Sequence, residues 1–247
     1  MHVARILPLR CRRRDRRAPA RRYQMDLSGG PSGYDTRMNA PDSTSLDQPE
    51  RLEQIAADVL TMAAPHEAEV AIGGGEGLSV TVREGTAEMV EHERDKSLSV
   101  TIYIDGRKAA RHTTDFATTA LEETVAAAVE IARHGEPDAY AGLAAQADLA
   151  TVLPDLDLHH PWPLDVDAAV AHAERCEQAA LAVDSRIKQS DGATVRRYDS
   201  TRVYANSNGF SGAYRATRHT ASAIMIAADD NGMQRGYWYE TSRNPAT

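Results

Sequence analysis

Short runs in which apolar and polar residues alternate occur in both halves of the sequence, next to pairs suited to tight turns. The run LSVTVREG (residues 78–85) has the period-two pattern of a half-buried strand. The run at residues 97–113 contains Asp105-Gly106, a pair typical of a two-residue hairpin. Similar runs flank Asn208-Gly209 and Asn231-Gly232. These patterns predict a mainly antiparallel sheet.

Three other segments have helical periodicity. Residues 49–65 place apolar side chains three and four positions apart, at Leu52, Ile55, Val59 and Met62. Residues 119–135 begin with the capping-box spacing of Thr119 and Glu122, and one face carries Leu121, Val125, Ala128, Val129 and Ala132. A third helix is expected around residues 166–183. The order helix, strands, helix, helix, strands predicts an α+β fold with helices packed on antiparallel sheet.

Composition and these patterns divide the chain into four expected segments. Residues 1–47 form a basic and polar leader, and residues 48–145 a unit of helix, β-meander and helix. Residues 146–164, rich in proline and aspartate, form a linker. Residues 165–247 supply a helix and further antiparallel strands.

The leader differs in charge from everything after it. Residues 1–24 contain nine arginines and one acid, Asp15. The whole chain has a formal net charge of −8 and these residues contribute +8, so the rest carries −16. No apolar run follows Arg22, as an export signal would require. We expect a disordered leader translated from upstream sequence, with Met38 as the true start; a mitochondrial-type transit segment and a nucleic-acid-binding arm are the alternatives.

Several protein classes are disfavoured by composition. Two cysteines, Cys11 and Cys176, cannot form a disulfide framework, and no apolar run approaches the roughly 20 residues that span a bilayer. We therefore expect a cytoplasmic protein without a membrane partner. The negative charge beyond the leader makes direct nucleic-acid binding by the folded part unfavourable.

Motifs in the order seen here are similar to those of the TldD/PmbA metallopeptidase family. The residues that carry the resemblance are Glu69-Val70, Val80 to Gly85, Tyr103 with Gly106-Arg107-Lys108, Pro137-Asp138 with Ala141-Gly142-Leu143, Asp155 to Leu158 with His160-Pro161, Asn206-Ser207 with Gly209 and Gly212, Arg218-His219, and Met233, Arg235 and Tyr237. The DLDL-x-HP and NSxGxxG segments look more like the PmbA branch, also called TldE.

The resemblance implies a subunit of a cytoplasmic zinc peptidase that acts on small or unfolded peptides. In such pairs a TldD-like catalytic partner carries HExxxH, whose histidines bind zinc and whose glutamate serves as base, while the PmbA-like subunit lacks these ligands. This chain is expected to be the PmbA-like subunit, inactive alone and truncated before the family's C-terminal domain. The alternative is a non-enzymatic binding module of the DNA gyrase modulator type.

Local candidates for chemistry are weak, so no catalytic or metal-binding residue is expected on this chain. His66-Glu67 cannot begin HExxxH, because Ala71 occupies the position of the second histidine. The remaining candidates fit other roles better: His172 with Cys176 on a helix and His159-His160 in the linker as structural residues, the acidic run Glu84, Glu88, Glu91, Glu93 and Asp95 as a solvated face, the glycines Gly73 to Gly75 as a flexible connection, and Asp229 to Gly232 as a hairpin turn. Substrate-binding residues cannot be predicted from these patterns.

Overall fold

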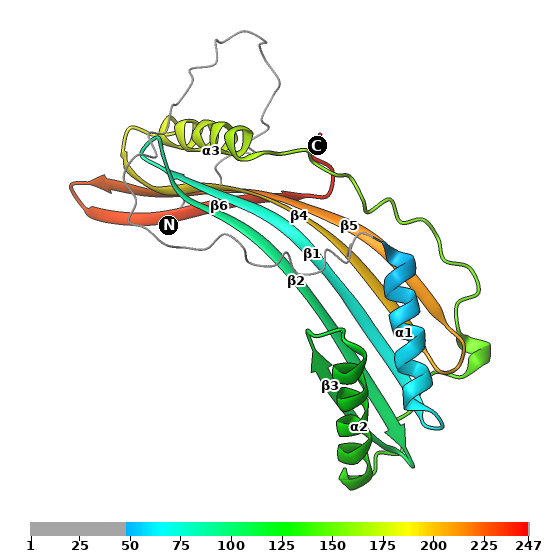
Figure 1. Ribbon diagram of the computed structural model, residues 1–247. Coiled ribbons are helices and arrows are strands. Elements are labelled where there is room, and N and C mark those ends of the chain that lie inside the picture. Colours follow the sequence, from blue (N-terminus) through cyan, green and yellow to red (C-terminus); the bar gives the residue numbers. More distant parts are fainter. Residues whose placement is uncertain (1–47, 247) are drawn as a thin grey trace, which may run out of the picture. The chain divides into compact units, whose positions relative to one another are not determined.

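The computed structural model describes residues 48–246 (Figure 1). The expectations for residues 1–47, including the start at Met38, lie outside the described residues. The element order is helix, three strands, helix, short 3-10 turn, helix and three strands. The predicted α+β class and element order are confirmed, while the boundaries of the four expected segments stay predictions.

One curled antiparallel sheet of six strands joins both halves of the described chain. Its spatial order is β3-β2-β1-β4-β5-β6, so β1 and β4 are central and β3 and β6 are the edges. The strands are β1 (Glu67–Arg83), β2 (Thr86–Ile104), β3 (Arg107–Thr113), β4 (Ile187–Asn206), β5 (Ser211–Asp229) and β6 (Gly232–Ser242).

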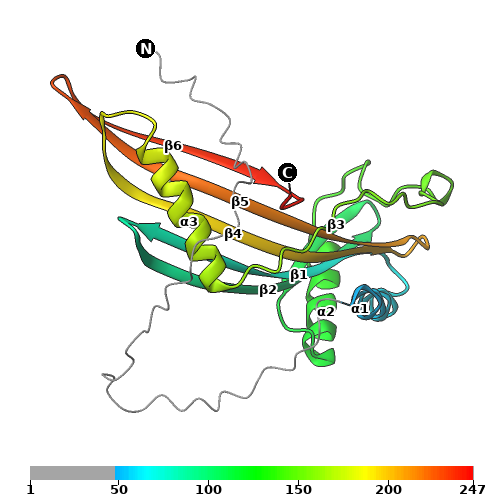
Figure 2. The same ribbon diagram turned by 90° about the horizontal axis from the view of Figure 1, so that it is seen from above.

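All three helices pack on the same face of this sheet, which follows from the alternation of side chains along β1. Val70 and Ile72 pack in the core under α1 (Pro49–Ala63) and α2 (Thr118–His134). Leu78 and Val80 pack under α3 (Val166–Leu181) at the other end of the strand. These β1 residues are separated by even numbers of positions, so their side chains point to one side. Figure 2 shows α3 lying across the central strands.

The helix faces agree with the predicted periodicity. In α1 the fully buried positions are Leu52, Ala56, Val59 and Ala63, with Ile55 and Met62 partly buried beside them. In α2 they are Leu121, Val125, Ala128 and Ala132. Small alanines between larger aliphatic residues let both helices approach the sheet closely, which compensates for the scarcity of phenylalanine and tryptophan.

The predicted capping box of the second helix is wrong. The N-cap is Ala117, and no side chain caps the helix there. The turn before the helix is instead held by Asp115, whose carboxylate accepts the N–H of Ala117 at 2.9 Å. The helix therefore starts one residue earlier, at Thr118, and Thr119 lies inside its first turn.

The hairpin turns predicted at glycine-containing pairs are confirmed. Asp105 and Gly106, with φ of 49° and 72°, connect β2 to β3. Positive φ at both positions gives a turn whose twist matches the flanking strands. The strands are longer than the alternating runs in the sequence. β4 begins at Ile187 and continues through Gly192 (φ 107°), where the pairing with β5 is irregular.

The chain from Ala144 into the linker follows the open edge of β5. Asn208, in the β4–β5 turn, donates its side-chain N–H to the carbonyl of Ala144 at 2.8 Å. Farther along, the N–H of Thr217 on β5 donates to the carbonyl of Leu158 at 2.9 Å. The linker thus covers the part of β5 that lies before its pairing with β6 begins at His219.

Candidate functional site on the helix-free face

Glycines at alternate positions of β1 leave room on the sheet face opposite the helices for side chains of the neighbouring strand. Gly73, Gly75 and Gly77 lie inside β1, so the expectation of a flexible connection at residues 73–75 is wrong. A Cβ at Gly75 would lie 2.6 Å from the Tyr198 ring, and one at Gly77 would lie 3.0 Å from it. These glycines are required because the Tyr198 ring crosses β1 above them.

Tyr198 links β4 to the acidic row of β2. Its hydroxyl donates to the Asp95 carboxylate at 2.5 Å. Burial, together with this hydrogen bond and the negative charge of Asp95, raises the pKa of Tyr198 to about 12. Arg196, whose guanidinium carbon lies 5.3 Å from the ring centroid, forms a salt bridge with Glu93. The central part of the helix-free face is therefore a cross-strand polar network.

A second acid–tyrosine cluster lies toward the α1 end of the same face. Glu69 accepts the hydroxyl of Tyr103 at 3.0 Å and that of Tyr204 at 2.7 Å. Burial and the neighbouring Glu69 raise the pKa of Tyr103 to about 12 and that of Tyr204 in the same direction. The two hydroxyls thus satisfy both oxygens of the Glu69 carboxylate.

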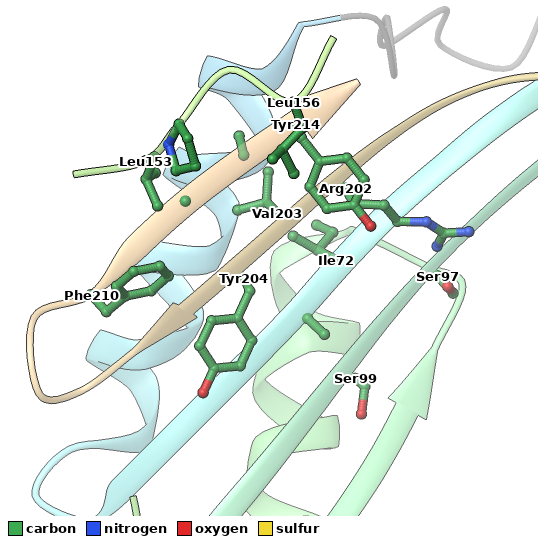
Figure 3. Close-up of a pocket in the computed structure, with 15 residues that line it drawn as sticks. Ile72, Ser97, Ser99, Leu153, Leu156, Arg202, Val203, Tyr204, Phe210 and Tyr214 are labelled. Atoms are coloured by element: carbon green, nitrogen blue, oxygen red, sulfur yellow. The ribbon is translucent and has the colours of Figure 1, made fainter. Parts of the chain in front are cut away.

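Between these clusters lies a cavity of about 490 Å³ (Figure 3). Its floor is made of small residues on β1 and β5, and its walls are apolar. The wall residues are Leu153 and Leu156 of the linker, Phe210 of the β4–β5 turn, and Tyr204 and Tyr214 of β4 and β5. A cavity of this size falls within the range of about 300–1,000 Å³ typical of ligand sites.

Arg202 is the charged residue that lines this cavity. In Figure 3 its guanidinium projects away from Phe210 and Leu153 and toward Ser97. A Cβ at Gly73 would lie 2.8 Å from the Arg202 Cδ, so this glycine leaves room for the arginine stem. No acid among residues 48–246 forms a salt bridge with Arg202.

The edge strand β6 presents aromatic side chains to solvent. Tyr237 is 73% exposed, Trp238 53% and Tyr239 58%. Consecutive residues of a strand point to opposite faces, so both faces of this edge carry aromatic surface. An exposed edge also offers unpaired backbone N–H and C=O groups to an added strand.

The structure gives the histidine candidates different partners. His66 lies between α1 and β1, at the helix-to-strand junction predicted for it. His159 contacts the Asp199 carboxylate at 2.9 Å, and His160 contacts the carbonyl of Asp157 at 2.9 Å. These contacts give both linker histidines structural roles on the α3 side of the sheet.

His172 and Cys176 share a face of α3 and pack inward. Cys176 lies against both small cores near the helix, as expected of a small core residue. Nδ1 of His172 accepts a hydrogen bond from Arg175 at 2.7 Å, and the ring lies edge-on to Trp162. Burial and the positive charge of Arg175 lower the pKa of His172.

The acidic run is divided among different partners. Glu88 forms a salt bridge with Arg83 at 3.6 Å, Glu93 pairs with Arg196, and Asp95 accepts from Tyr198. The Asp229 carboxylate accepts the N–H of Asn231 at 2.8 Å in the β5–β6 turn, which confirms the predicted hairpin there.

The described part of the chain has neither a cluster of metal ligands nor a membrane-spanning helix. Among residues 48–246 no three His, Cys, Asp or Glu side chains are grouped so that they could hold a metal ion. No helix in the same range has both the length and the apolar character needed to cross a membrane.

The cavity and its arginine were missed at the sequence level, although one signal pointed to them. Arg196, Tyr198, Arg202 and Tyr204 occupy even positions of β4, and Gly73, Gly75 and Gly77 occupy odd positions of β1. Large residues at period two, facing glycines at period two, indicate side chains that lie across a neighbouring strand. The pairing of β1 with β4 was needed to recognise it.

Solved structures with similar folds place this architecture in a known class. A protein from Bacteroides thetaiotaomicron described as a modulator of DNA gyrase superposes with a TM-score of 0.72 at 22% identity, over 80% of this chain and 46% of the other. TldE from Thermococcus kodakarensis gives a TM-score of 0.54 at 13% identity, over 79% and 43%. The fold is that of the TldE and gyrase-modulator proteins.

Sequence comparison gives the family itself. The family model described as PmbA/TldA metallopeptidase domain 1 matches residues 68–132, and the one described as the central domain matches residues 159–246. This chain belongs to the PmbA/TldD metallopeptidase family, and the resemblance seen in its motifs is confirmed.

Curated relatives agree with this assignment. Metalloprotease PmbA of Escherichia coli O157:H7 is 39% identical over 194 residues, which are 78% of this chain and 43% of that protein. A metalloprotease PmbA homolog of Haemophilus influenzae is 35% identical over 208 residues, 83% of this chain and 46% of that protein. The chain spans less than half the length of these relatives.

Proposed function

We propose that this chain is part of the PmbA-like, metal-free subunit of a TldD/TldE-type zinc metallopeptidase that acts on small or unfolded peptides in the cytoplasm. The observation that carries the proposal is the match to two successive domains of the family, together with relatives named metalloprotease PmbA. The zinc would be held by a TldD-like partner, because residues 48–246 offer no metal-ligand group.

In this proposal the chain's role is to hold the substrate in extended form. Within residues 48–246 no further strand pairs with β6, and this edge carries exposed aromatic residues, among them Tyr237 and Trp238. A peptide that adds to such an edge as a further strand is bound through its backbone, so its sequence matters little. Loose sequence preference is what a peptidase for unfolded peptides requires.

Zinc held by the partner would supply Lewis-acid activation of water for peptide hydrolysis. The contribution of this chain is confined to binding and orientation. Tyr237 and Tyr239 lie two residues apart on one side of β6, so they can contact every second side chain of an added strand.

The test combines the chain with an HExxxH-bearing partner and an unfolded peptide. We expect cleavage that requires both proteins and is abolished by a zinc chelator. Cleavage that persists with the chelator, or that the partner performs equally well without this chain, contradicts the proposal. A version of the partner with its HExxxH glutamate replaced by glutamine is the matched control and should bind without cleaving.

A non-enzymatic binding role is the second candidate. It is favoured by the similarity of the fold to a protein described as a modulator of DNA gyrase. The negative charge carried beyond residue 24 opposes direct contact with DNA. The two candidates differ in whether activity needs the HExxxH-bearing partner, which the same assay measures.

A further inference from the structure

We propose that the cavity lined by Arg202 binds the C-terminal residue of a peptide, with its apolar side chain inside and its carboxylate on the guanidinium. The proposal rests on the proposed function in one respect, that the ligand is a peptide. The site lies between β1, β4, β5 and the linker (Figure 3).

The interior of the cavity suits one apolar side chain and the backbone that precedes it. Ala71, Gly73 and Gly212 form a floor without bulk. Leu153 and Phe210 close one side, and a Cβ at Gly212 would lie 3.0 Å and 3.2 Å from these two side chains. Removing a leucine or phenylalanine side chain from water into such walls is favourable, whereas glycine gains nothing there.

Among the residues that line the cavity, Arg202 is the one with a charged side chain. Glu69 and Asp95, on the same face, accept hydrogen bonds from tyrosine hydroxyls rather than from Arg202. Arg202 forms no salt bridge within residues 48–246. A guanidinium is a planar fork that matches the two oxygens of a carboxylate.

The arrangement favours a peptide C-terminus over an internal acidic residue. Aspartate and glutamate carry their charge at the end of a polar side chain and have no apolar group for the cavity. A C-terminal leucine or phenylalanine carries the carboxylate and the apolar side chain on the same Cα. The cavity and the Arg202 guanidinium are adjacent, so one such residue satisfies both.

The test measures binding to the 247-residue chain alone by fluorescence anisotropy. The probe is an N-terminally labelled hexapeptide of five alanines and a C-terminal leucine with a free carboxylate. Two further probes are the same peptide as a C-terminal amide and a peptide ending in glycine. We expect the leucine acid to bind about tenfold more tightly than either.

Variants assign the effect to the proposed site. Arg202→Gln should weaken binding of the leucine acid about tenfold and leave the amide unchanged. Arg218→Gln is the matched control, because Arg218 is an exposed arginine that does not line this cavity. Ala71→Phe fills the cavity from an exposed floor position and should remove the preference for leucine over glycine.

Each result supports or overturns the proposal. Equal binding of acid and amide, or unchanged binding by Arg202→Gln, overturns it. Competition by N-acetyl-leucine as strong as that of the unlabelled hexapeptide also overturns it, since the site would then be one for small acids. If a variant fails to fold, the acid, amide and glycine probes on the unaltered chain still decide. The assay needs neither zinc nor a partner, so its failure is separate from failure of the peptidase assay.

Discussion

The carboxylate of Glu177 on α3 accepts a hydrogen bond from the backbone N–H of Gly85 at 2.8 Å, in the turn between β1 and β2. Its second oxygen accepts the N–H of Glu84, also at 2.8 Å. Both turn residues have positive φ, and Glu177 is only 2% exposed. Consecutive N–H groups that converge in this way form an anion-binding hollow, and here a helix side chain fills it.

Replacing Glu177 should therefore loosen the end of the β1–β2 hairpin. Glu177→Gln removes the charge and one acceptor and brings an N–H₂ group against backbone donors, at a cost of about 2 kcal/mol in the free energy of unfolding. Urea denaturation followed by circular dichroism measures the change. Glu174→Gln, one turn earlier on α3, is the control. Equal stability of the two variants would show that the turn does not depend on the carboxylate.

The glycine row of β1 should tolerate no side chain. Gly75→Ala would place a Cβ 2.5 Å from the carbonyl oxygen of Asp199 and 2.6 Å from the Tyr198 ring. Overpacking of this kind costs about 1–3 kcal/mol. Gly236→Ala on β6 meets nothing within 4 Å and should change stability little. Thermal unfolding of both variants tests the comparison, and a Gly75→Ala protein as stable as Gly236→Ala would contradict it.

Much of the fold was predictable because it depends on local chemistry. Helix periodicity located α1, α2 and α3, and Asp105-Gly106 located a hairpin. Strand lengths were less accessible. Gly73 to Gly75 interrupt the apolar alternation of β1. Glycine is needed there because the side chains of Tyr198 and Arg202, more than 100 positions later in the sequence, lie over this part of the strand.

The cavity could not be predicted for a related reason. Leu153 belongs to a segment without periodicity, and it meets Phe210 and Gly212 only because the linker follows the edge of β5. Such placement depends on sheet order, which no local pattern encodes. The motifs could indicate a family, but Arg202 acquires its surroundings only from pairing between strands.

Alkaline pH should break the link between Tyr198 and Asp95. The folded pKa of Tyr198 is about 12 against an ordinary value of 10.0, so the protonated form is favoured in the folded state. The stability from this shift is fully present below pH 10 and is lost as pH rises toward 12. Absorbance at 295 nm should show late ionisation, and Asp95→Asn should bring it earlier. An unchanged titration in Asp95→Asn would rule out the link.

Acid pH should act on α3 through His172. Burial and Arg175 lower the pKa of His172 below 6.5, so the neutral ring is favoured in the folded state. Stability from this shift is present above pH 6.5 and is lost as pH falls through the folded pKa. NMR titration should show the low pKa, and Arg175→Gln should raise it. If Arg175→Gln leaves the His172 titration in place, the charge of Arg175 has no part in the shift.

Substitutions at exposed positions of β6 should weaken binding while changing the stability of the fold little. Tyr237 and Tyr239 are 73% and 58% exposed, so replacing both by lysine should shift the unfolding temperature little. Lysine on an edge strand discourages the addition of a further strand, because the incoming strand would remove water from the charged ammonium group. If β6 is where an extended peptide or partner strand adds, the double variant should weaken that association about tenfold or more in an anisotropy or pull-down assay. Tyr140→Lys, at a turn position after α2 that is 97% exposed, adds the same charge outside β6 and should bind as the unaltered chain does. Equal loss in both variants would mean that charge alone weakens binding, and no loss in either would place the interaction elsewhere than β6.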